Sequence, residues 1–191
     1  MTESIRWRRL DSPGHEVAEF APIEEGWLLS GTATFAESGR PCKLEYTITC
    51  DRAFVTRHCS VTGRIGDERV NVDLKRDSAS GAWSIDGAPQ PALADCIDVD
   101  LGFSPSTNLL PIRRLALPIG ASADVRAAWV RFSELTLEVL EQRYTRIAPD
   151  RYLYESDGGR FCRELIVDDT GFVLEYPGLW TSEVRSSAPA R

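Results

Sequence analysis

The sequence has few of the residues that enzymes most often use for acid-base chemistry: it contains only two histidines, His15 and His58. Neighbouring residues of a strand point to opposite faces, so His58 and Cys59 would make a poor pair of base and nucleophile. The sequence also lacks a glycine-rich phosphate loop and a His-Glu-x-x-His metal motif. We therefore expect no cofactor, no metal site and no catalytic residues.

Basic residues are fewer than acidic ones: the sequence contains 22 Lys and Arg residues and 29 Asp and Glu residues, which gives a formal net charge of −7. Binding to phosphates requires clustered basic residues, so we expect no nucleic-acid partner. No apolar run approaches the roughly 18 residues that cross a bilayer, and the first residues lack the apolar core of a signal peptide. We expect a cytoplasmic protein without a transmembrane segment.

The sequence contains no C-x-x-C pair and no zinc-type spacing among its five cysteines. An odd number of cysteines without paired spacing favours reduced, largely buried thiols, as is usual in the cytoplasm. The cysteines are Cys42, Cys50, Cys59, Cys96 and Cys162.

Regular alternation of apolar and polar residues is the dominant pattern. It is clearest over residues 42–50, where every second residue is Cys, Leu, Tyr or Ile. Similar short segments follow one another, separated by residues typical of turns, and residues 124–147 are also interpreted as strands although a helix could bury their apolar residues. We expect one all-β domain over residues 1–184, a roll, barrel or sandwich, followed by a flexible tail over residues 185–191.

Three acids, two adjacent arginines and an uncharged turn lie together in the stretch from Asp95 to Leu115. Alternation predicts a strand at its beginning, and Gly, Ser-Pro and Thr-Asn predict a tight loop over residues 102–108. We expect a return strand over residues 110–117. Pro111 cannot donate a ladder hydrogen bond, so this strand should lie at a sheet edge or contain a bulge.

Pairing of these two strands would bring the two arginines within reach of two of the aspartates. A guanidinium group can bind a carboxylate through two hydrogen bonds. A buried structural ion pair is the favoured interpretation, an exposed ligand site is the second, and catalysis or a divalent metal is the third. The residues concerned are Asp98, Asp100, Arg113 and Arg114.

Residues 98–108, followed by Leu-Pro-Ile-Arg-Arg-Leu over residues 110–115, resemble a bacterial family named for glycolipid binding. Supporting matches are Trp-Val-Arg-Phe at 129–132, Glu-Gln-Arg-Tyr at 141–144 and Tyr-Pro-Gly-Leu-Trp at 176–180, so the resemblance spans nearly the full chain. It implies a spiral β-roll, which is a strongly curved antiparallel sheet, and an ability to bind a glycolipid or a related amphiphile. It carries over no catalytic motif.

A curved sheet could hold an acyl chain on its concave apolar face and a sugar at its rim. Two alternatives remain open: a protein-interaction module or homo-oligomer, and a hydrolase that uses Asp98 and Asp100 as a carboxylate pair. Large aromatic side chains are mostly buried, so Trp27, Trp83 and Trp129 are expected in the core. The expected rim residues are Asp98, Asp100, Asn108, Arg113, Arg114, Arg143, Tyr144 and Trp180.

Overall fold

The computed structural model describes residues 2–188, with side chains through residue 183, and arranges them in one sheet of 15 strands. The first eight strands are β1 (Thr2–Arg9), β2 (Gly14–Ile23), β3 (Gly26–Glu37), β4 (Arg40–Asp51), β5 (Thr56–Ile65), β6 (Glu68–Arg76), β7 (Trp83–Ile85) and β8 (Ala88–Pro89). The other seven are β9 (Asp98–Leu101), β10 (Ser122–Arg131), β11 (Thr136–Ala148), β12 (Arg151–Ser156), β13 (Phe161–Val167), β14 (Val173–Tyr176) and β15 (Trp180–Ala188). Neighbouring strands are antiparallel except β9 and β10, so the prediction of an all-β, strongly curved sheet is confirmed.

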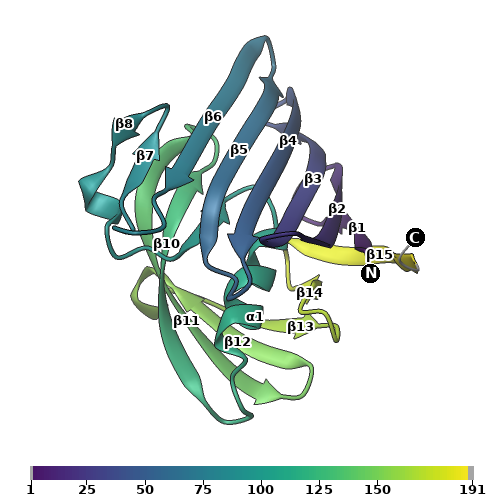
Figure 1. Ribbon diagram of the computed structural model, residues 1–191. Coiled ribbons are helices and arrows are strands. Elements are labelled where there is room, and N and C mark those ends of the chain that lie inside the picture. Colours follow the sequence, from purple (N-terminus) through teal and green to yellow (C-terminus); the bar gives the residue numbers. More distant parts are fainter. Residues whose placement is uncertain (1, 189–191) are drawn as a thin grey trace.

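The chain forms two meanders that meet in the middle of the sheet. The first runs from β1 outward to β8, and the second begins at the opposite edge with β9 and returns to β15, which pairs with β1. The first and last described residues, Thr2 and Ala188, are therefore paired and lie side by side (Figure 1). The expected boundary at residue 184 falls within β15, which pairs with β1 up to Ala188. The sequence of β15 is mostly polar, so it shows no alternation that would predict a strand. The remainder of the expected tail, residues 189–191, lies outside the described residues.

The two outer edges of the sheet are joined by the segment between β8 and β9 rather than by a ladder. The carbonyl oxygen of Cys96 accepts hydrogen bonds from Trp83 Nε1 at 2.9 Å and from Arg76 Nε at 3.1 Å. The backbone N–H of Thr56 donates to the carbonyl oxygen of Ile97 at 3.2 Å. These contacts connect the two edges of the curved sheet.

The segment after β9 departs from the prediction, because it is helical and not a return strand. It contains the 3-10 helix η2 (Ser106–Asn108) and the α-helix α1 (Leu109–Leu115). Leu109 and Leu110 are fully buried, and consecutive buried residues suit a helix surrounded by protein. Pro111 lies in the first turn, where a backbone N–H has no helical partner in any case. Two further 3-10 helices are η1 (Pro91–Leu93) and η3 (Asp157–Gly159).

A helix occupies part of the concave side of the sheet. Figure 1 shows α1 inside the opening of the roll, between the ends of β4 and β5 and the strands β12 and β13. The interpretation of residues 124–147 as strands is confirmed by β10 and β11. Within residues 2–188, no helix has the length and apolar character needed to cross a membrane.

Candidate functional site: an aromatic pocket on the inner face

A pocket of ≈ 370 Å³ opens on the inner face of the second meander. We call it the aromatic pocket, because five aromatic side chains from β10 and β12–β15 line it together with leucines and a few polar groups. Large aromatic surfaces combined with a few polar groups are typical of small-molecule sites. The five aromatic residues are Trp129, Tyr154, Phe161, Tyr176 and Trp180.

Strand alternation explains how three of these rings come together. Tyr154 of β12, Phe161 of β13 and Tyr176 of β14 point to the same face from consecutive strands, and their ring centroids lie 6.0–6.2 Å apart. Tyr176 is also the cross-strand partner of Trp180 on β15. Residues on the same face of adjacent strands are the natural unit of side-chain contact in a sheet. These strands therefore supply a continuous aromatic wall.

Asp100 is the polar centre of the aromatic pocket. It lies on β9 opposite Trp129 of β10, and its Oδ2 accepts a hydrogen bond from Gln142 Nε2 at 2.9 Å. The same amide nitrogen donates to Tyr154 Oη at 3.1 Å. Burial raises the pKa of Asp100 to about 6, and the nearby Asp98 contributes in the same direction. Among residues 2–188, no hydrogen bond occupies the other carboxylate oxygen of Asp100, so it can accept one from a ligand.

Ser104 forms part of the pocket wall and is held by a buried network behind it. Its Oγ donates a hydrogen bond to Glu16 Oε1 at 2.5 Å, and Tyr46 Oη donates to the same oxygen at 2.6 Å. Gly31 leaves space for this tyrosine, because a Cβ there would lie 2.4 Å from Tyr46 Oη. Burial raises the pKa of Glu16 to about 7. The network holds Ser104 in a fixed orientation in which its hydroxyl proton is already donated.

Two of the predicted site residues form a buried brace outside the pocket. Arg114 Nε donates to Asp98 Oδ1 at 3.1 Å, and Arg114 Nη2 donates to Asp98 Oδ2. Asp98 is only 1% exposed, and its burial raises its pKa while the guanidinium group opposes that change. The pair joins β9 to α1, which is the structural role that the sequence favoured.

The amide of Asn108 reaches the aromatic pocket, and Tyr144 lies behind it. Asn108 Oδ1 accepts a hydrogen bond from Tyr144 Oη at 2.8 Å, and its Nδ2 donates to the carbonyl oxygen of Pro105 at 3.1 Å. Tyr144 is fully buried. The pair anchors η2 to β11, so Tyr144 supports the pocket without lining it.

Arg113 and Arg143 do not join the other predicted residues. Arg113 lies at a second opening of ≈ 470 Å³, where its guanidinium carbon is 5.2 Å from the ring centroid of Phe54. Arg143 is exposed on the outer face of β11 and forms an ion pair with Asp124 at 2.9 Å. The placement of these two arginines at the same rim was wrong, because a helix replaces the return strand and Arg143 alternates away from the inward-facing Tyr144.

Sequence reasoning missed most of the aromatic wall. Trp129 was assigned to the core, yet it is half-buried and lines the pocket. Tyr154 and Phe161 belong to a predicted hairpin, but alternation alone does not tell which face of a hairpin is the inner one. Gln142 was identified only as part of a family-like motif. The signal that could have found these residues is the occurrence of aromatic residues at alternating positions on neighbouring predicted strands.

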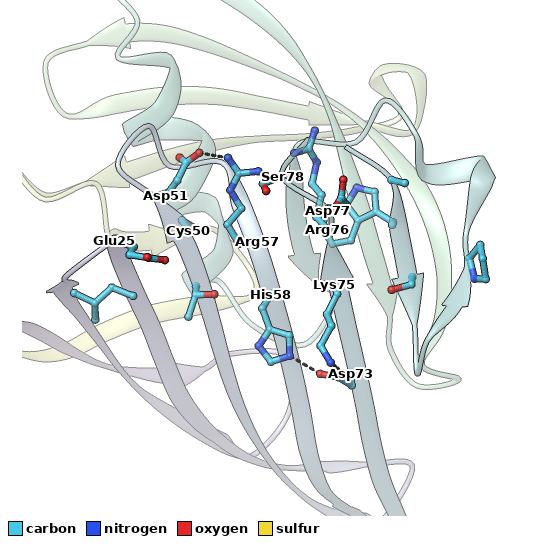
Figure 2. Close-up of a pocket in the computed structure, with 16 residues that line it drawn as sticks. Glu25, Cys50, Asp51, Arg57, His58, Asp73, Lys75, Arg76, Asp77 and Ser78 are labelled. Carbon is cyan, nitrogen blue, oxygen red and sulfur yellow. Dashed lines mark hydrogen bonds and ion pairs between the residues drawn. The ribbon is translucent and has the colours of Figure 1, made fainter. Parts of the chain in front are cut away.

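A larger pocket of ≈ 1120 Å³ lies on the outer face of β4–β7 and is called the outer pocket here. Figure 2 shows His58 turned toward Asp73, and Arg57 turned toward Asp51. Lys75 binds the second oxygen of Asp73 at 2.9 Å. Arg57 Nη1 is nevertheless buried without a hydrogen-bond partner among the described residues, so these pairs do not account for every polar group that lines the outer pocket. In the described part of the chain, no group of three or more His, Cys, Asp or Glu residues is placed to hold a metal ion.

Comparison with known proteins agrees with this architecture. A family model described as "Putative glycolipid-binding" matches residues 4–182. The chain belongs to this family. It is also similar to the crystal structure of a DUF1089 family protein from Pseudomonas aeruginosa, with 30% sequence identity, a TM-score of 0.77 and coverage of 87% of this chain and 91% of that chain. None of the curated proteins matches the chain.

Proposed function

We propose that this protein binds a glycolipid or similar amphiphile in the aromatic pocket, without catalysis. The observation that carries the proposal is a pocket on the inner face in which five aromatic side chains surround one half-buried carboxylate. Aromatic faces pack against the C–H surface of a sugar ring, and a carboxylate oxygen accepts hydrogen bonds from its hydroxyl groups. The family name is consistent with this ligand class.

We infer from the dimensions of the pocket that the headgroup binds inside it and the acyl chain lies outside. A volume of ≈ 370 Å³ is near the lower end of the range for ligand sites, which suits one sugar ring rather than a whole glycolipid. Leu179 lines the mouth, and its carbonyl oxygen accepts a hydrogen bond from the backbone N–H of Leu10, whose side chain is 44% exposed. An acyl chain leaving the pocket could follow these two leucines. This arrangement reverses the one expected from the sequence, where the chain occupied the concave face.

The hydrolase alternative is less consistent with the carboxylates. An acid and base pair would require Asp98 to exchange protons with a substrate, but both of its oxygens accept hydrogen bonds from Arg114. Asp100 alone lacks a partner for the second role. We retain a cytoplasmic location within the proposal, because the free cysteines suit a reducing compartment.

Native mass spectrometry of the protein purified without detergent, followed by organic extraction and lipid analysis, tests the proposal. A protein that shields an amphiphile is expected to retain a stoichiometric adduct whose extracted mass identifies a lipid. A clean apo mass that persists after incubation with a cell lipid extract would contradict binding. A mass corresponding to two chains would instead favour the homo-oligomer.

A matched pair of tryptophan variants tests the location. Trp129 and Trp27 are both half-buried, but only Trp129 lines the aromatic pocket, whereas Trp27 stacks on Phe20 with a centroid distance of 5.0 Å. Trp129→Ala should weaken binding of an alkyl glycoside about fivefold, because one aromatic contact is worth about 1 kcal/mol. Trp27→Ala should leave the dissociation constant within about twofold, measured by isothermal titration calorimetry. Equal losses in the two variants would contradict the location.

A further inference from the structure

We propose that the headgroup recognised by the aromatic pocket carries an ammonium group, as an amino sugar does. This inference rests on the proposed function and specifies its ligand class. Its basis is the combination of a carboxylate without a counter-ion and a wall of aromatic faces, because both attract a cation.

The pocket has an excess of negative charge. Among the described residues, its charged lining side chains are Asp100 and Asp157, and no Lys, Arg or His lines it. Asp157 is exposed and its Oδ1 forms an ion pair with Arg160 at 2.6 Å. Within residues 2–188, the only hydrogen-bond donor to the Asp100 side chain is the neutral amide of Gln142. An ammonium group would therefore supply the one counter-ion that the pocket lacks.

The groups that influence Asp100 directly do not neutralise its charge. Asp98, the nearest other carboxylate to influence Asp100, is already paired with Arg114. The phenols of Tyr144, Tyr154 and Tyr176 also surround Asp100, and burial raises all three of their pKa values, so they stay neutral near pH 7. The half-buried Asp100 thus keeps a charge that neither neighbouring residues nor bulk water fully offsets.

The rings of the wall already attract cations of the protein itself. An aromatic face stabilises a cation within about 6 Å of its centroid, and the effect grows when water is excluded. Three arginines outside the pocket lining lie over its rings, and two of them, Arg9 and Arg131, also form ion pairs with Asp11 and Glu138. The guanidinium carbon of Arg163 lies 4.7 Å from the ring centroid of Phe161. That of Arg131 lies 5.6 Å from the ring centroid of Trp129, and that of Arg9 lies 5.6 Å from the ring centroid of Trp180.

The same features disfavour other headgroups. A phosphate or sulfate group beside Asp100 would meet a like charge with no cation in the lining to compensate. A neutral sugar can fit the pocket but does not balance the negative charge of Asp100. Burial raises the pKa of Asp100 to about 6, and protonation removes the attraction, so the preference should weaken as the pH falls through this value.

Three octyl glycosides with the same chain test the inference: octyl glucoside, octyl glucosaminide and octyl N-acetylglucosaminide. The glucosaminide carries an ammonium group, and the N-acetyl compound keeps the nitrogen without its charge. Calorimetric titration near pH 7 should give the glucosaminide a dissociation constant at least about tenfold lower than those of the other two. Equal affinity for all three would overturn the inference while leaving the proposed function intact. No binding of any of them would contradict the proposed function itself.

Two acidic residues of the lining provide matched variants. Asp100→Asn removes the unpaired charge with little change of shape, so the preference for the glucosaminide should fall to within about twofold. Asp157→Asn removes a charge that Arg160 already neutralises, and the preference should remain. Circular dichroism confirms that both variants are folded. A preference that survives Asp100→Asn would overturn the inference.

Discussion

The two meanders of the sheet present different inner faces to the same interior. In β4, the inward residues are Cys42, Leu44, Tyr46, Ile48 and Cys50, and four of these five side chains lack a charged or strongly polar group. In β11 and β12, the inward residues include Gln142, Tyr144, Tyr154 and Ser156. The first face is mainly apolar, apart from the buried Glu16 and Tyr46, and packs into the core, whereas the second carries more polar groups and leaves a pocket. One continuous sheet thus separates its stabilising half from its candidate binding half.

The largest expected effect comes from the ion pair that braces the second meander. Arg114→Ala leaves Asp98 buried without a counter-ion, which should lower the free energy of unfolding by about 3–5 kcal/mol. Arg143→Ala removes a solvent-exposed ion pair and should cost less than about 1 kcal/mol. Urea denaturation followed by circular dichroism measures both. A loss below about 1 kcal/mol for Arg114→Ala would show that the brace is dispensable.

The same substitution in each meander compares the two inner faces directly. Leu44 is fully buried in β4, so Leu44→Ala should cost about 3 kcal/mol through lost burial and the cavity left behind. Leu140 is half-buried beside the aromatic pocket, and Leu140→Ala should cost about 1 kcal/mol because a pocket already borders it. Denaturant titrations at one pH give both values. Equal costs would remove the distinction between a packed face and a pocket face.

A smaller effect should appear in the pH dependence of stability. The pKa of Glu16 rises from 4.5 to about 7 in the folded protein, so folding favours its protonated form. Its contribution is therefore complete below about pH 4.5 and is lost as the pH rises through about 7. Glu16→Gln should remove that part of the slope, up to about 2 kcal/mol between pH 5 and 8. Unchanged slopes in melting temperature against pH would contradict the role of Glu16.

Much of the fold could be predicted because strand alternation is a local signal. Alternation identified β4, and the content of β-branched and aromatic residues decided the ambiguous region that contains β10 and β11. Alternation failed for α1, because a short run of leucines around a proline is equally compatible with an edge strand until the surrounding protein is known. The full length of β15 could not be predicted, because it depends on backbone pairing with β1. Backbone pairing produces no recognisable pattern in a mostly polar sequence.

The candidate site was predictable only in part. Asp100, Asn108 and Trp180 were named from family-like motifs, and the structure brings them to one pocket. The sequence placed one of the two arginines within reach of Asp98 or Asp100 without choosing between them. The structure pairs Arg114 with Asp98, on a helix and a strand rather than on two strands. Tyr154 could not be assigned, because its position depends on which face of a curved sheet turns inward. Such long-range geometry is not contained in a local pattern.

The most direct test of ligand binding in the aromatic pocket is an NMR titration that follows the indole N–H signals of the tryptophans with octyl glucoside. The indoles of Trp7 and Trp83 donate to Val173 and Cys96 and lie outside this pocket, whereas those of Trp129 and Trp180 make no such bond within residues 2–188. We expect saturable shifts of the Trp129 and Trp180 signals, with Trp7 and Trp83 unchanged. Shifts confined to Trp83, which borders the outer pocket, or no shifts at all, would contradict the account.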